Sequence, residues 1–200
     1  MFTRHGVILF EAVSALQKSI RRGLERDAFT WAVELASTHE SYLWRRLTVI
    51  ANEDIGLASP ETVMLVNSQR AAWWDMREHG DDPAAFMILS CTVLAMCRAP
   101  KSRLSDHFLC AVVTKNGHAQ PEVPDYALDK HTLRGKRMGR GNQHFIEVGA
   151  HLENAAKLDD PYAAEARANW LADKWPGLPE LKKLKPTNGA KQARLLPDDD

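Results

Sequence analysis

The spacing of apolar residues between positions 7 and 114 constrains the fold more than any other feature of the sequence. These residues recur at intervals of three and four, as on one side of a helix, and almost no stretch alternates as a half-buried strand would. Short connections separate the segments, which favours antiparallel packing of neighbouring helices. The pattern therefore predicts an all-α fold, a compact bundle of about six helices.

We expect this bundle to fill residues 1–115, with helices over 10–27, 27–40, 41–56, from Ser59-Pro60-Glu61, over 83–98 and over 101–113. Asp27 suits the N-cap of the second helix, and the fifth is apolar nearly all round, which is typical of a central helix. The faces expected to be buried carry Phe10, Val13, Leu16 or Gln17, and Ile20 in the first helix, Phe29, Val33 and Ala36 in the second, and Leu104, Phe108 and Val112 in the sixth.

The sequence after the bundle changes in character. Residues 116–175 begin with a polar, proline-containing stretch and continue with a basic helical segment over 126–138 and two further helices over 143–158 and 160–175. Residues 176–200 contain few apolar residues and end in "DDD", which predicts an extended or mobile tail.

Composition excludes several classes of protein. Lys+Arg and Asp+Glu both total 26, so an attraction to nucleic acid or to an anionic membrane has to come from a local patch. Cys91, Cys97 and Cys110 lie in apolar helical segments without a C-x-x-C pair, as reduced, buried cysteines do in intracellular proteins. No segment has the roughly 18 apolar residues of a membrane span. We expect a cytoplasmic protein with no membrane partner, no cofactor and no catalytic residue.

Glu53 and Asp54 stand where the third helix should end, close to the negative end of its dipole, where carboxylates are unfavourable. A helical wheel places Asp54 on one face with Leu43, Leu47 and Ile50. A buried carboxylate needs a partner, because an unpaired one costs several kcal/mol. The candidate partners, within the bundle or across an interface, are Arg45, Arg46, Lys101 and Arg103.

The segment "LDKHTLRGKRMGRGNQHFIE", residues 128–147, concentrates the basic residues. In a helix, Lys130, Arg134 and Arg137 would share one face, with Lys136 and Arg140 nearby, and such a stripe suits the phosphates of DNA. A solvated face or a set of ion pairs between helices would show the same pattern.

This segment invites two catalytic interpretations. No G-x-x-x-x-G-K-[ST] motif is present, so a P-loop nucleotide site is excluded, and Gly139 and Gly141 are better placed to end the basic helix. The four residues Asp129, His131, His144 and Glu147 have ligand types that would hold a metal for a hydrolase or another phosphate-handling enzyme, if the two halves met in space. Neither H-E-x-x-H nor cysteine ligands accompany them.

Four segments, in order, resemble the C-terminal region of the replication-associated recombination protein A family (RarA or MgsA) of AAA+ ATPases. They are "SALQKSIR" (14–21), "AFTWAVELA" (28–36), "LWRRLTVIANEDIGLASPE" (43–61) and "APKSR" (99–103). Together they cover about residues 10–115, and "LDKH" with "GKRMGRG" is similar to the family's next segment.

The resemblance implies a helical region that assembles tetramers and works in DNA replication and repair. Because no Walker motif is present, we expect no ATPase activity of this chain itself, which leaves a homo-oligomeric scaffold or adaptor that could contact DNA. A module that docks onto a separate AAA+ ATPase of the family is a further interpretation.

Overall fold

The computed structural model describes residues 1–117 and 120–174, and the tail expected over 176–200 lies outside them. The chain divides into two compact units, the first ending at Ala119 and the second starting at Gln120. Helices α1 to α8 and short π- and 3₁₀-helical turns make up the regular structure of the described residues, with no strand beyond an isolated bridge between Phe2 and Ile8. The all-α prediction is confirmed. No helix in this part of the chain is long and apolar enough to cross a membrane.

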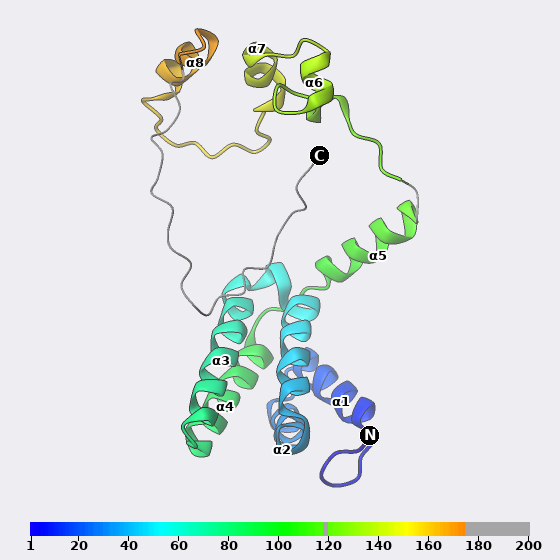
Figure 1. Ribbon diagram of the computed structural model, residues 1–200. Coiled ribbons are helices and arrows are strands. Elements are labelled where there is room, and N and C mark those ends of the chain that lie inside the picture. Colours follow the sequence, from blue (N-terminus) through cyan, green and yellow to red (C-terminus); the bar gives the residue numbers. More distant parts are fainter. Residues whose placement is uncertain (118–119, 175–200) are drawn as a thin grey trace, which may run out of the picture. The chain divides into compact units, whose positions relative to one another are not determined.

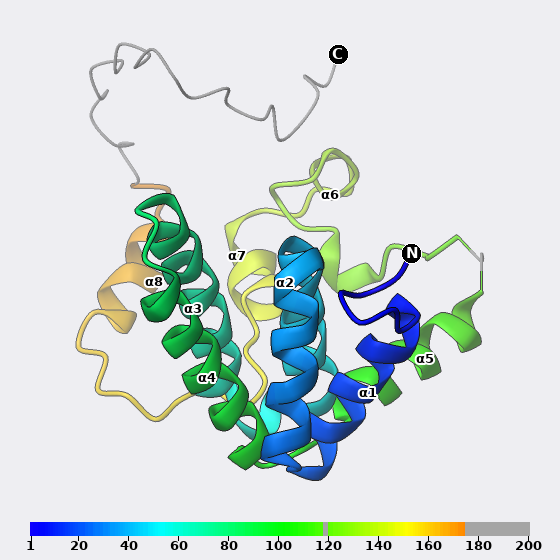
Figure 2. The same cartoon turned by 90° about the horizontal axis from the view of Figure 1, so that it is seen from below.

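The first unit contains five helices (Figure 1). They are α1 (Leu9–Arg22), α2 (Glu25–Ile50), α3 (Pro60–Glu78), α4 (Asp82–Arg98) and α5 (Leu104–Asn116). Figure 2 shows α1 beside α2 and α3 beside α4, and α4 also packs on α1 and α2. The bundle proper is therefore made of α1 to α4.

Large apolar side chains from α2, α3 and α4 form the centre of the bundle. Trp44 and Trp73 lie with ring centroids 5.6 Å apart, and Trp73 meets the edge of Phe86 at 5.7 Å. Both tryptophans are buried, as are Leu43, Leu47 and Ile50 on the face that the wheel predicted. Helix α1 covers this core with Leu16 and Ile20, both 0% exposed.

Some predicted helix faces and boundaries were wrong. Phe10 is 72% exposed, and Leu16 rather than Gln17 is buried in α1. In the part of α2 before the kink at His39, the buried residues are Ala28, Ala32 and Leu35, one position before the predicted set, and the small alanines lie on the side where α1 packs. Asp27 does not cap α2, since the helix starts at Glu25 and Asp27 lies in its first turn.

The predicted boundary between the second and third helices is found at His39. Its backbone angles, φ −140° and ψ 43°, are not helical, so α2 consists of two helices joined across a kink. The expected start of α3 is confirmed, with Ser59 before the helix and Pro60 at its first position. Asp81 caps α4 by accepting a hydrogen bond from the Ala84 amide at 3.0 Å.

The α4 helix is buried on one side only. Leu89, Val93 and Met96 are 0% exposed, whereas Met87 is 70% exposed because α3, α2 and α1 all pack on the opposite side. The cysteines divide in the same way. All three are unpaired, but only Cys97 is buried, and the expectation of three buried cysteines was wrong for Cys91 and Cys110.

Helix α5 does not complete the bundle. It contacts the bundle around the turns at 51–58, and Figure 1 shows it leading away from α1 to α4. Its predicted buried face is exposed among the described residues, with Leu104, Phe108 and Val112 at 57%, 68% and 38%. Because the first unit supplies no second layer over α5, the expectation that this face is buried within the bundle was wrong.

Over residues 120–174, the second unit has short elements and few buried residues. It contains α6 (Leu133–Arg137), α7 (Asn142–His144) continued by a π-helical turn (Phe145–Gly149), and α8 (Ala163–Leu171). The helix expected over 126–138 was too long at its start, since α6 begins only at Leu133, and the helix expected over 143–158 was too long at its end, since residues 151–160 are irregular. Gly139 follows α6 with φ 75°, as expected for a glycine that ends the basic helix. Gly135 is required at its position, because a Cβ there would lie 1.9 Å from the Asp129 carbonyl oxygen.

We expect Leu89→Ala to lower the free energy of unfolding by about 2–5 kcal/mol, because it opens a cavity in the core. Met87→Ala on the same helix removes a side chain that is 70% exposed and serves as the control. Urea denaturation followed by circular dichroism measures both. Equal losses for the two variants would contradict the assignment of the buried side of α4.

Candidate functional site

A π-helical turn, Ala51–Ile55, directly follows α2 and carries the first candidate site. A π-helical turn inserts an extra residue into the helix and is often found at functional positions. Here the turn brings Asp54 into the bundle, where it is 0% exposed, and leaves Glu53 at the edge. Gly56 then turns the chain with φ 49° toward α3.

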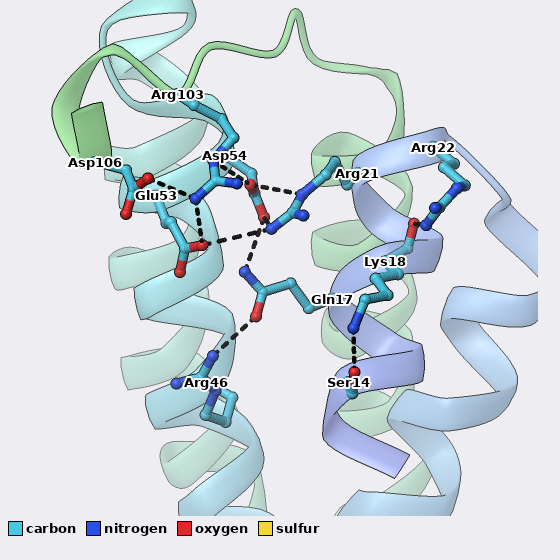
Figure 3. Close-up of polar contacts among 10 residues, drawn as sticks. All are labelled: Ser14, Gln17, Lys18, Arg21, Arg22, Arg46, Glu53, Asp54, Arg103 and Asp106. Carbon is cyan, nitrogen blue, oxygen red and sulfur yellow. Dashed lines mark hydrogen bonds and ion pairs between the residues drawn. The ribbon is translucent and has the colours of Figure 1, made fainter. Parts of the chain in front are cut away.

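Both oxygens of the Asp54 carboxylate accept hydrogen bonds from α1 (Figure 3). The Arg21 guanidinium donates through Nε to Oδ1 at 2.8 Å and through Nη2 to Oδ2 at 3.2 Å. Gln17, one turn earlier on α1, donates to Oδ2 at 3.1 Å. This two-point geometry is the strongest that an arginine and a carboxylate form.

The connection between α4 and α5 adds a second cation to this corner. Arg103 donates to Glu53 at 3.3 Å and to Asp106 at 2.5 Å, and its Nε lies 4.0 Å from the Asp54 Oδ1. The Asp54 carbonyl oxygen accepts from the Ser102 amide at 2.9 Å. The charged corner, as we call Arg21, Glu53, Asp54, Arg103 and Asp106, thus joins α1, the end of α2 and the start of α5.

The other expected partners of the acids lie elsewhere. Lys101 donates to the Cys97 and Ala99 carbonyl oxygens at 3.0 and 2.5 Å and so satisfies the last turn of α4. Arg46 donates to Gln17 at 2.9 Å, which links it to Asp54 only indirectly. Arg45 is exposed and stacks on Tyr42, 5.5 Å from the ring centroid. Arg21, which the sequence reasoning missed, is the principal partner.

The arrangement of the charged corner fits a structural role. A general acid or base needs an oxygen that can reach a substrate. The Asp54 oxygens are buried and already accept hydrogen bonds from Arg21 and Gln17. Burial raises the pKa of the Cys97 thiol to about 11, which disfavours the thiolate that a nucleophile needs.

The second candidate site is the basic segment, where Lys130, Arg134 and Arg137 were expected on one helix face. Asp129 accepts a hydrogen bond from the His131 amide at 2.9 Å, and Thr132 caps α6 by accepting from the Gly135 amide at 3.0 Å. These bonds make a turn over 129–132, so the helix starts only at Leu133. Lys130 lies outside it, and the predicted three-residue stripe was wrong.

The five basic residues of this segment divide into two groups. Arg140 is bound within the unit through the carbonyl oxygens of Asp125 and Leu128, both at 2.7 Å, and through the Asp125 carboxylate at 2.5 Å. Lys130 donates to Asn142 at 2.5 Å. The remaining cations are exposed and have no ion pair with any residue that the structure describes; they are Arg134, Lys136 and Arg137, which we call the basic trio.

The metal alternative is not favoured. Among residues 1–117 and 120–174, no group of three or more His, Cys, Asp or Glu side chains could hold an ion. The Asp129 carboxylate binds the His131 ring at 2.8 Å. This bond, together with the hydrogen bond from the His131 amide, lowers the pKa of the Asp129 carboxyl. Glu147 instead lies by Gln143 and, at 4.0 Å, by Arg167. These contacts account for Asp129, His131 and Glu147 without a metal, whereas the buried His144 Nδ1 has no hydrogen-bond partner among the described residues.

We expect Asp54→Asn to lower the free energy of unfolding by about 2–4 kcal/mol, because it leaves a partly buried Arg21 without its main counter-charge. Glu25→Gln, at the exposed pair with Arg98, is the control and should change stability little, since exposed pairs contribute little. Urea denaturation is again the measurement. If both variants were as stable as the unchanged protein, the charged corner would not be holding the helices together.

Comparison with known proteins identifies the family. The family described as MgsA AAA+ ATPase C terminal matches residues 27–165. Replication-associated recombination protein A of Haemophilus influenzae is 26% identical over 97% of this chain, and that of Bacillus subtilis is 32% identical over 66%. ATPase WRNIP1 of Dictyostelium discoideum is 28% identical over 70%.

The chain spans 40% of the Haemophilus protein's length, 31% of the Bacillus protein's and 16% of the Dictyostelium protein's. The family match includes α3, α4 and nearly all of α2, together with the charged corner's Glu53, Asp54, Arg103 and Asp106 and the whole basic trio. With more than half of its residues matched, the chain belongs to the MgsA AAA+ ATPase C-terminal family.

Proposed function

We propose that this protein acts in replication-associated recombination as a non-enzymatic assembly module, a homo-oligomer whose subunits associate through α5. The observation that carries the proposal is the exposed apolar surface of this helix. Five of its large side chains are between 38% and 68% exposed among the described residues: Leu104, Phe108, Leu109, Val112 and Val113. We call them the α5 surface.

An isolated helix of this length is not stable in water without a partner. Helices shorter than about 12–15 residues are marginal alone, and α5 has 13. Its apolar residues are spread around the helix rather than gathered in one stripe, which is typical of a helix buried on several sides. Association between copies supplies such cover, because a symmetric interface brings the same surface from each subunit.

The magnitudes favour a partner that is itself apolar. Fully burying one exposed large apolar side chain contributes about 1.5–3 kcal/mol, so the five partly exposed side chains of one α5 surface supply roughly 4–8 kcal/mol. Association costs an estimated 4–15 kcal/mol in lost translational and rotational freedom. Burial of one α5 surface against a polar partner would barely offset this cost. Two copies bury two such surfaces, so self-association is the more stable arrangement. By its resemblance to the RarA family, the expected assembly is a tetramer.

The charged corner supports assembly by fixing the start of α5. Arg103 and Asp106 bind each other at the first turn of the helix, and Arg103 also binds Glu53. The direction in which α5 leaves the bundle is thereby set before any partner binds, which reduces the entropy lost on association.

Contact with DNA is a second part of the proposal, supported by the basic trio. Arg134 and Arg137 are three residues apart in α6, so their side chains lie on the same side of the helix. Neither forms an ion pair with the described residues, and cations without a counter-charge are free to displace the counterions of a phosphate backbone.

An AAA+ ATPase is the partner that the relatives suggest. The matched family is described as the C-terminal part of such an ATPase. We therefore propose that the assembled helical module works together with an ATPase module of this family in the cytoplasm.

Phe108→Glu should lower the fraction of protein that is oligomeric, because it places a charge within the apolar α5 surface. Met64→Glu, at a residue of α3 that is 71% exposed, is the matched control and should leave the mass unchanged. Multi-angle light scattering at micromolar concentration gives the mass, which we expect to be a multiple of 22.5 kDa for the unchanged protein. A monomer for the unchanged protein would contradict the assembly role.

The double variant Arg134→Ala/Arg137→Ala should bind DNA more weakly, with a salt dependence of log K that is shallower by about two charges. Arg22→Ala/Arg26→Ala removes the same charge from exposed positions of the first unit and should change neither quantity. Fluorescence anisotropy of labelled oligonucleotides over a salt series measures both. Equal binding by the two double variants would exclude the basic trio as the contact.

A further inference from the structure

The second unit contains a hollow of about 500 Å³ that none of the features above uses. Its lining combines aromatic, cationic and amide side chains from three segments far apart in the sequence: Lys130, His131, Asn142, Phe145, Trp170 and Asp173. Such a mixture of flat apolar surface and a few polar groups is typical of small-molecule and nucleobase sites.

Aromatic rings form one side of the hollow. Phe145 lies at the centre of the group, with its ring centroid 4.9 Å from that of His131 and 6.0 Å from that of Trp170, both nearly edge to face. Trp170 is 40% exposed and also lines a neighbouring hollow of about 350 Å³ beside Tyr162. An aromatic ring that borders two open spaces is available for stacking.

Polar groups hold the hollow in shape. The Asn142 amide donates to the Trp170 carbonyl oxygen at 2.7 Å and accepts from Lys130 at 2.5 Å, so it ties α8 to the turn over 129–132. The Lys130 ammonium lies 5.4 Å from the Phe145 ring centroid and forms no ion pair with a described carboxylate. A positive charge therefore stands directly beside the aromatic surface.

We propose that this hollow binds an unpaired base of single-stranded nucleic acid, with Trp170 stacking on the base and Lys130 contacting the adjoining phosphate. Every base has a flat face, so stacking on an exposed aromatic ring tolerates any sequence. The Asp173 carboxylate at the rim can accept a hydrogen bond from a base amino group. The base must be unpaired, because a base within a duplex already has both faces stacked.

The inference rests on the proposed contact with DNA and deepens it. The basic trio would track phosphates of either a duplex or a single strand, whereas the hollow selects the single strand. The two proposals can fail separately. Binding by the basic trio depends on the charge of the phosphates, whereas binding in the hollow depends on the presence of a base.

The experiment compares two single-stranded oligonucleotides of the same length, an oligothymidylate and one whose nucleotides are all abasic. Both carry the same phosphates, so only the bases differ. Trp170→Ala should weaken binding of the oligothymidylate about 10-fold and leave binding of the abasic strand unchanged. Trp170→Phe retains a ring and should restore most of the affinity.

Tyr126→Ala is the matched control, an aromatic side chain of the same unit that is 66% exposed and outside the hollow. Equal affinity of the unchanged protein for both strands, or an equal loss for both with Trp170→Ala, would overturn the base site while leaving the basic trio in place. If neither strand binds the unchanged protein at all, the proposed contact with DNA fails as well.

Discussion

The ion pair between the buried Asp54 and the partly buried Arg21 is the interaction on which the first unit depends. It joins the turn after α2 to α1 and lets a carboxylate lie at a helix C-terminus inside the core. The Arg21 guanidinium binds the Asp54 carboxylate through two nitrogens, and Gln17 donates a further hydrogen bond to it. The Asp54 main chain then holds Ser102, so the same residue fixes where the chain leaves α4 for α5.

That geometry connects the fold with the proposed function. The π-helical turn points Asp54 inward and places Glu53 where it pairs with Arg103. Arg103 also binds Asp106 in the first turn of α5. An apolar helix is thereby started in a set direction, away from the bundle that would otherwise cover it. In the described part of the second unit few residues are buried, and hydrogen bonds of Asn142 and Arg140 hold its short elements together while cations and aromatic rings stay exposed.

The helical class and most of the helices could be predicted from the sequence, because apolar spacing reports local structure directly. The burial of Asp54 on the side of Leu43, Leu47 and Ile50 could be predicted too, but its partner could not. Arg21 lies 33 residues away, and only packing of α1 against α2 brings the two together. The one available signal was Gln17 and Arg21 at helical spacing on α1. The predicted extent of the basic helix was wrong because Asp129 and Thr132 form a turn. Their side chains bind backbone amides in competition with a helix, and the spacing of residues does not show this.

A double-mutant cycle tests the central claim most directly. The unfolding free energies of Asp54→Asn, Arg21→Met and the double variant are compared with that of the unchanged protein by urea denaturation. If the pair joins α1 to the end of α2, the two changes should be coupled by about 1–3 kcal/mol. Effects that add within about 0.5 kcal/mol would show that the residues act independently and would contradict the account.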